Sequence, residues 1–134
     1  MDAGLQALLA RADAQAGHLR RLVVRDDGRF RFIGVDAVDA VDAVDAERND
    51  VRAHVGHSSE AVRLSSTALE AQLDPTRFAR VHRSRIVDIR RVTEVEPLFG
   101  GEYVLILIGG RRATTGRSFR DRVPHVLGLI PHRA

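Results

Sequence analysis

The middle of the chain reads Phe78-Ala79-Arg80-Val81-His82-Arg83-Ser84-Arg85-Ile86-Val87-Asp88-Ile89. Apolar residues gather towards both ends of this segment, and its centre, from His82 to Ser84, is polar and basic. This pattern predicts two short strands held in a core, with a surface loop between them. A loop on such a rigid support suits contact with a nucleic-acid backbone.

The basic charge is concentrated in the C-terminal half of the chain. All 21 basic side chains are arginines, and the formal net charge is only +3. From Arg77 to Arg122 there are 11 arginines and 5 acids, a balance of +6, whereas Val35 to Asp50 has 6 acids and 1 arginine, a balance of −5. A basic half predicts a polyanionic partner, and arginine suits bidentate contacts with phosphate and guanine.

Length and composition predict one globular domain with a short extension. The chain has 134 residues and is 44% hydrophobic, which is enough for a core. We expect residues 1–19 to form a helix or linker and residues 20–130 to form the domain. No apolar run is long enough to span a bilayer, the start lacks the pattern of a signal peptide, and cysteine is absent. These features favour a cytoplasmic location and no contact with membranes.

Alternating apolar residues and turn residues predict several hairpins and two helices. One hairpin is expected over residues 22–33, around Asp26-Asp27-Gly28, a second over 51–64, around residues 56–60, and a third over 103–115, around Gly109-Gly110. Further strands are expected at residues 85–89 and 92–96. A short helix is expected over residues 65–73, with Thr67 or Ser66 as its cap, and a last helix is expected to be capped by Ser118 and shortened or kinked by Pro124.

The segment from Val35 to Ala46 repeats Val-Asp-Ala four times. A period of three fits neither a strand nor a long helix, so we expect a helical turn or 3₁₀ segment there. We interpret the repeat as a replication slip with little structural role.

Catalytic and metal-binding patterns are weak in this sequence. Ser84, His82 and an aspartate could be combined into a triad, but no strained nucleophile turn supports it. His54 and His57 have the spacing of a metal pair without a third ligand. We therefore expect no enzyme activity, no metal and no cofactor.

Three polar clusters remain at predicted loops or element ends: residues 48–50, residues 82–84 and residues 116–118. The third opens the predicted last helix, where free backbone donors favour an anion such as phosphate. Three such clusters in a chain of short strands point towards DNA binding.

Three segments resemble the motifs of the LytTR family, DNA-binding domains of bacterial transcription regulators: Val44 to His54, Leu73 to Val87 and Thr115 to Val123. The resemblance extends over nearly all of residues 20–128. It implies a mostly β fold, with short antiparallel strands in stacked sheets, one short central helix and a C-terminal helix. Departures include Arg48 in place of the usual glycine, Asp50 in place of an aromatic residue, and Asp88 in place of asparagine.

The resemblance also implies that loops enter successive major grooves of double-stranded DNA. The further partners that we expect are a second copy of the chain, as a homodimer on repeated half-sites, and an upstream sensor or receiver protein that controls it. The chain is either a stand-alone regulator or a piece of one. The expected contacts with DNA are Arg48, Asn49, Asp50, Arg52, His82, Arg83, Ser84, Arg117, Ser118 and Arg120.

Two alternatives stay open at this point. The chain could be a β-rich interaction module whose basic face meets an acidic partner protein. Binding to single-stranded nucleic acid is disfavoured, because it needs exposed aromatic residues for stacking and aromatic residues make up only 4% of the chain.

Overall fold

The computed structural model describes residues 4–8, 17–45, 50–119 and 122–128. Residues 4–8 are helical, and the first hairpin follows as β1 (Arg21–Asp26) and β2 (Arg29–Gly34). Asp27 and Gly28 in its turn both have positive φ angles, 47° and 76°. Two successive positive φ angles match the twist of a two-residue hairpin, so the first predicted hairpin is confirmed.

The central sheet has five antiparallel strands in the order β5-β4-β3-β7-β6. Its strands are β3 (Ala40–Asp45), β4 (Asp50–Val55), β5 (Ser58–Val62), β6 (Phe78–His82) and β7 (Arg85–Asp88). The β4–β5 turn is shorter than predicted, since β5 already begins at Ser58, and Gly56 supplies a φ of 58° there. The segment from Phe78 to Asp88 forms the predicted pair of short strands.

The structure of the Val-Asp-Ala repeat differs in part from our expectation. Its first unit is the 3₁₀ turn η1 (Val35–Ala37), as the period of three suggests, but residues 40–45 form β3. Because β3 lies between β4 and β7, it is the middle strand of the central sheet. The repeat is therefore a structural element. The period-of-three argument failed because pairing with two neighbouring strands outweighs local pattern.

The third sheet has the order β10-β9-β8. It contains β8 (Val92–Pro97), β9 (Tyr103–Leu107) and β10 (Arg112–Thr114), and the turns η2 (Ile89–Arg91) and η3 (Phe99–Gly101) precede and follow β8. The predicted hairpin around Gly109-Gly110 is thus confirmed as β9 and β10.

Both helices differ from prediction at their starts. The central helix α2 (Ser66–Gln72) is capped by Ser65, whose hydroxyl accepts a hydrogen bond from the Ala68 amide at 3.0 Å. Thr67 and Ser66 are wrong as caps, because the cap lies one residue before Ser66 and two before Thr67. Ser118 lies inside the 3₁₀ turn η4 (Arg117–Phe119), and the helix α3 begins only at Arg122 and ends at Val126, with Pro124 inside it. Ser118 is therefore not the cap of α3.

The central sheet carries a core on each face, because side chains alternate along its strands. Val41, Ala53 and Ile86 pack on one face with residues of β1 and α2. Ala40 and Val87 pack on the other face with residues of β9, β10 and α3. This double burial explains why nearly all residues of β6 and β7 are buried, Arg80 and Asp88 included.

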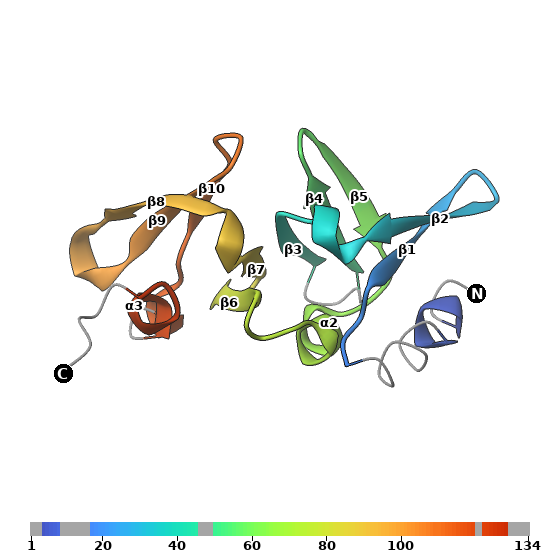
Figure 1. Cartoon of the computed structure of the whole chain (residues 1–134), viewed down its shortest axis with the longest axis horizontal. Coiled ribbons are helices and arrows are strands. Elements are labelled where there is room, and N and C mark those ends of the chain that lie inside the picture. Colours follow the sequence, from blue (N-terminus) through green and yellow to red (C-terminus); the bar gives the residue numbers. More distant parts are fainter. Residues whose placement is uncertain (1–3, 9–16, 46–49, 120–121, 129–134) are drawn as a thin grey trace.

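The protein is mostly β, with short antiparallel strands in stacked sheets, one short central helix and a C-terminal helix, as the sequence predicts. Figure 1 shows the three sheets following one another along the long axis, with α2 and α3 on the same side of the view. The tips of the β4–β5 and β9–β10 hairpins point to the opposite side (Figure 1).

Candidate nucleic-acid interface

The turn between β6 and β7 presents the polar cluster of residues 82–84. Its flanks are firmly held, since residues 78–81 and 86–88 are all buried. Arg83 at the tip is exposed, and none of the described residues forms an ion pair or hydrogen bond with its side chain. A free guanidinium on a rigid turn is suited to contact an external anion or base edge.

His82 and Ser84 stabilise this turn through one ring nitrogen. The Ser84 amide donates to His82 Nδ1 at 3.1 Å, and Ser84 Oγ lies 2.9 Å from the same atom. Since a backbone amide can only donate, Nδ1 acts as the acceptor, and this network assigns the ring proton to Nε2. No described residue bonds to that nitrogen, which leaves it as a donor towards an acceptor outside the protein.

The third cluster lies directly against the second. The Gly116 amide donates to the Val81 carbonyl at 2.8 Å, and a Cβ on Gly116 would stand 3.1 Å from His82 Cδ2. Glycine at this position therefore permits a close approach of two backbones. Arg117 and Ser118, the next residues, are exposed. The structure thus brings residues 82–84 and 116–118 together, although Gly116 comes 33 positions after Arg83 in the sequence.

The first cluster is only partly described, because Arg48 and Asn49 lie outside the described residues, as does Arg120. Asp50, the described residue of this cluster, pairs with Asp45 at the end of the β3–β4 hairpin, and the nearby Ala43 amide donates to the Ser84 carbonyl at 2.8 Å. Asp50 is half-buried, and Arg63 Nε lies 3.9 Å from its Oδ1. This end of the hairpin is therefore beside the β6–β7 turn, and Arg63 offsets part of the charge of Asp50.

Arg52 lies farther along β4 and is exposed. Its guanidinium donates to Ser59 Oγ on β5, with Nη2 at 3.1 Å and Nε at 3.2 Å. The structure therefore places Arg52 on the sheet surface and not at the turn. To contact DNA, Arg52 would have to replace its hydrogen bonds to Ser59 with hydrogen bonds to a phosphate.

Asp42 accepts bonds from two basic side chains beside the turn. Arg85 Nε lies 2.7 Å from its Oδ1, and His54 Nε2 lies 2.8 Å from its Oδ2. Burial alone would raise the pKa of the Asp42 carboxyl, but the hydrogen bonds from Arg85 and His54 outweigh burial and hold that pKa below its ordinary value. Asp42 is thus ionised at neutral pH, and Arg85 is partly neutralised.

Sequence reasoning missed Arg80 and Glu70, which support the turn from below. Arg80 is buried, and its guanidinium donates to Glu70 Oε1 from Nε at 2.9 Å and to the Arg83 carbonyl from Nη1 at 2.6 Å. A signal was present in the sequence, since an arginine between Ala79 and Val81 on an apolar strand needs a partner when it is buried.

We use "candidate interface" for residues 82–84, residues 116–118 and Asp50, the described part of the first cluster, at one end of the central sheet. A family model of the LytTR DNA-binding domain matches residues 31–128. The chain belongs to the LytTR family. The family is defined by DNA binding and is not a class of enzymes.

Curated relatives of this LytTR domain are regulatory proteins. Transcriptional regulatory protein LytR from Staphylococcus aureus (strain N315) is 38% identical over 61 residues, which are 46% of this chain and 25% of that protein. Sensory transduction protein LytT from Bacillus anthracis is 36% identical over 61 residues, with the same shares. The matches span about a quarter of the length of these relatives.

A solved LytTR domain has the same fold. The LytTr DNA-binding domain from Bacillus cereus superposes with a TM-score of 0.72 at 18% identity, covering 81% of this chain and 97% of that chain. At this identity the match establishes the fold of the LytTR domain and not its target.

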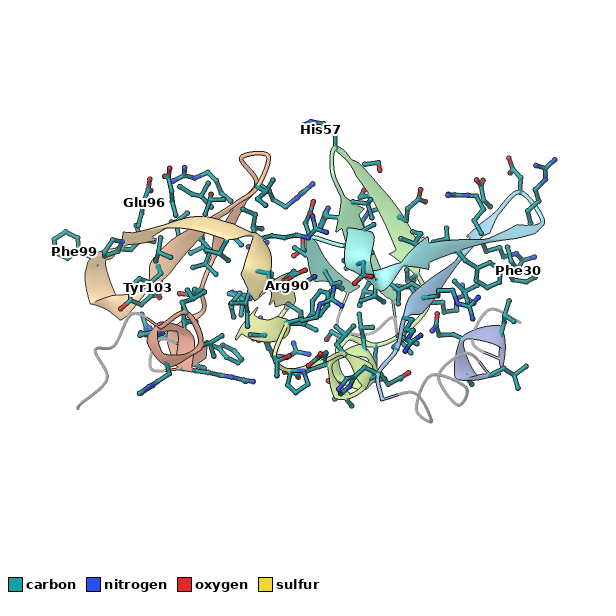
Figure 2. The ribbon with its side chains drawn as sticks, viewed as in Figure 1. Phe30, His57, Arg90, Glu96, Phe99 and Tyr103 are labelled. Carbon is teal, nitrogen blue, oxygen red and sulfur yellow. The ribbon has the colours of Figure 1, made fainter. Side chains whose placement is uncertain are left out.

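No group of three or more potential metal ligands occurs among the described residues. His54 is bonded to Asp42, and His57 stands at the exposed tip of the β4–β5 turn, where Figure 2 labels it. In the His82–Ser84 pair the ring nitrogen already accepts the Ser84 amide, so it serves the turn and is a poor general base. Within the described ranges, no helix has the length and apolarity needed to cross a bilayer.

Proposed function

We propose that this chain binds double-stranded DNA at specific sequences and acts in transcription regulation, with the loops of the candidate interface inserted into the major groove. The observation that carries the proposal is the convergence of Arg83 and Arg117, both exposed, on one end of the sheet through the Gly116–Val81 hydrogen bond. Membership in the LytTR family supports it.

The chemistry of each segment fits a different part of a duplex. Arg83 offers a planar fork that matches the two acceptors of guanine, and His82 Nε2 and the Arg117 guanidinium offer donors for phosphate. Arg48, Asn49, Asp50, Arg52, Ser84, Ser118 and Arg120 complete the proposed contacts. Homodimer formation on repeated half-sites, an upstream sensor or receiver protein and a cytoplasmic location belong to the same proposal.

A direct test compares duplex with single-stranded DNA. We expect labelled random duplex to bind more tightly than either of its single strands, because the candidate interface offers cations and donors but no exposed aromatic platform among its described residues. Fluorescence anisotropy at low salt measures both affinities. Equal or tighter binding to single strands would contradict the proposal.

A second candidate is an acidic protein partner at the β1–β2 hairpin. Phe30 and Phe32 on β2 are 38% and 51% exposed and alternate with Arg29 and Arg31. Figure 2 shows Phe30 near one end of the molecule, far from Phe99 at the other. If this surface carried the function, Phe32→Ser would abolish partner binding and leave duplex affinity unchanged.

A further inference from the structure

We propose that Arg80 is a positioning residue, which connects α2 to the β6–β7 turn and thereby fixes the direction in which the Arg83 side chain projects. This inference rests on the proposed function, since it concerns how Arg83 meets a base. Arg80 is only 9% exposed, so its own guanidinium is not available to DNA. Its effect on recognition has to pass through the backbone of the turn.

The two hydrogen bonds of Arg80 join two separate elements. Nε donates to the Glu70 carboxylate on α2, and Nη1 donates to the carbonyl of Arg83 itself. Bonds with a charged donor are shorter and stronger than neutral ones. Because the second bond ends on the peptide group of Arg83, it restricts the backbone from which that side chain projects.

The turn needs such a bond because its strand ladder is irregular. The pairing register between β6 and β7 shifts between Arg80 and His82, so that His82 pairs with Arg85 across the end of the hairpin. A register shift leaves one residue without its regular ladder partner and loosens control over the following turn. The guanidinium of Arg80 replaces the missing backbone restraint.

Glu70 extends the same support towards the third cluster. Its other carboxylate oxygen lies 3.9 Å from Arg122 Nη2, and Arg122 is the first residue of α3, which follows η4. The side chain of Glu70 is 35% exposed, so its removal disturbs the core less than removal of Arg80 does. One carboxylate on α2 therefore contacts both Arg80, which supports the turn that carries Arg83, and α3, which follows the turn that carries Arg117.

The test uses the full chain with four substitutions. Arg80→Gln and Glu70→Gln each remove one side of the pair, and Arg83→Ala removes the proposed base contact. Arg80→Lys keeps the charge but offers one ammonium in place of the two separate nitrogens, Nε and Nη1, that meet the two acceptors. Arg31→Gln is the matched control, because it removes an equally short arginine–glutamate pair, Arg31 Nη2 to Glu60 Oε1 at 2.9 Å, in the β1–β2 region. Circular dichroism checks that each variant is folded at the binding temperature.

Binding-site selection and salt titration are then measured for each variant. We expect Arg80→Gln to lose discrimination at the same base position as Arg83→Ala, by roughly tenfold, which is the loss of one bidentate contact. The double variant Arg80→Gln/Arg83→Ala should lose no more discrimination at that base position than Arg83→Ala alone. The salt slope of Arg80→Gln should stay that of the wild type, since Arg80 meets no phosphate, and Glu70→Gln should show a smaller loss at that same position.

Several results would overturn the positioning role. Arg80→Gln and Glu70→Gln with unchanged base preference would show that Arg80 only stabilises the fold, and a salt slope reduced by about one unit would show direct phosphate contact. Full rescue by Arg80→Lys would show that charge alone matters. If Arg80→Gln does not fold, Glu70→Gln decides. Failure of the wild type to prefer duplex DNA would instead reject the proposed function.

Discussion

Arg83 and Arg117 are both exposed arginines of the candidate interface, but their backbones are held differently. The Arg83 carbonyl accepts a bond from Arg80, whereas Arg117 begins the 3₁₀ turn η4 and follows Gly116. A side chain whose backbone is fixed loses less entropy when it makes a two-bond contact with a base. We therefore expect Arg83 to select a base and Arg117 to contact phosphate.

This difference predicts distinct effects of two alanine substitutions. Arg83→Ala should relax base preference at one position per half-site, with a loss of about 1–3 kcal/mol of discrimination. Arg117→Ala should weaken binding evenly across sequences and flatten the salt slope by about one unit. Binding-site selection with both variants distinguishes these effects. A changed preferred base in Arg117→Ala alone would reverse the two roles.

Gly116 is the residue at which two clusters of the interface touch. In Gly116→Ala the new Cβ would meet His82 Cδ2 at 3.1 Å and His82 Cα at 3.4 Å, so the two segments must separate. We expect a loss of about 1–2 kcal/mol in the free energy of unfolding, together with weaker duplex binding. Thermal denaturation and anisotropy measure both.

The matched control for this substitution is Gly34→Ala, since no atom lies within 4 Å of a Cβ at position 34. Gly34→Ala should leave both quantities close to those of the wild type. Equal effects of the two substitutions would mean that the contact with His82 has no special role.

The lowered pKa of the Asp42 carboxyl predicts that the stability of the protein depends on pH. Burial alone would raise the pKa of its carboxyl, but the bonds from Arg85 and His54 lower it below the unfolded value. A lowered pKa gives stability that is present above the unfolded pKa, about 4, and is lost as the pH falls through the folded pKa. Urea denaturation between about pH 6 and 3 should show a smaller loss for Asp42→Asn than for the wild type. Parallel curves for the two proteins would contradict this assignment.

At the scale of elements, the Val-Asp-Ala repeat supplies both a turn and a strand. In η1 a period of three puts Val35 and Val38 on one side, and Val41 then joins them from β3, so all three are buried in one cluster. The aspartates find cations on other elements: Asp36 pairs with Arg77 at 2.6 Å and Asp39 with Arg91 at 3.0 Å. Each repeated residue type thus has a defined environment.

Deleting one repeat unit should nevertheless be tolerated. Because the repeat is perfect, removal of Val35–Ala37 gives the same sequence as removal of Val44–Ala46. Val44 is 54% exposed and the register with β4 shifts between Ala43 and Asp45, so the chain can keep η1 and the pairs that residues 40–43 of β3 form with β4 and β7, losing only the pair of Asp45 with Asp50. We expect the free energy of unfolding to change by less than about 1 kcal/mol, as for surface changes.

The control for the deletion is Val41→Ala, which removes buried side-chain volume from the middle of β3. Val41 is buried in the core, so this substitution should cost roughly 2 kcal/mol. Chemical denaturation compares both variants. A deletion that destabilises more than Val41→Ala would show that the end of β3 is essential.

The turn η2 explains why the chain tolerates Asp88 at a position where the family pattern has asparagine. This residue, where asparagine is common in the family, is fully buried and accepts the Arg90 amide at 3.0 Å. Its other oxygen lies near Arg90 and Arg91 at 3.3 and 3.4 Å. The negative charge of aspartate is offset by these two arginines of η2, which connects the central sheet to the third sheet.

At the scale of the molecule, binding to DNA should depend strongly on salt. If Arg52, Arg117 and Arg120 neutralise phosphates and Arg83 also displaces counterions as it enters the groove, the logarithm of affinity should fall with the logarithm of salt concentration at a slope of roughly −3 to −5, since each such arginine adds about −0.9. Anisotropy titrations between about 50 and 200 mM salt give this slope. A slope near zero would reject the DNA proposal and favour the acidic protein partner.

The sequence by itself determined the elements whose signals are local. Asp26-Asp27-Gly28 and Gly109-Gly110 predict turns because glycine and aspartate accept unusual backbone angles, and the alternation from Phe78 to Ile89 predicts buried strands around a polar turn. These signals also supported the mostly β fold and the position of residues 82–84 in a turn between two strands.

Tertiary structure alone decided how distant segments meet. Nothing in the pattern of Val-Asp-Ala makes it the middle of a sheet; β4 and β7 do so by pairing with both of its edges. Nothing near Arg80 in the sequence identifies Glu70 as its partner, or Gly116 as the neighbour of His82. These contacts depend on the stacking of three sheets, because burial makes an unpaired charge or backbone group costly, and the partner that relieves this cost lies far away in the sequence.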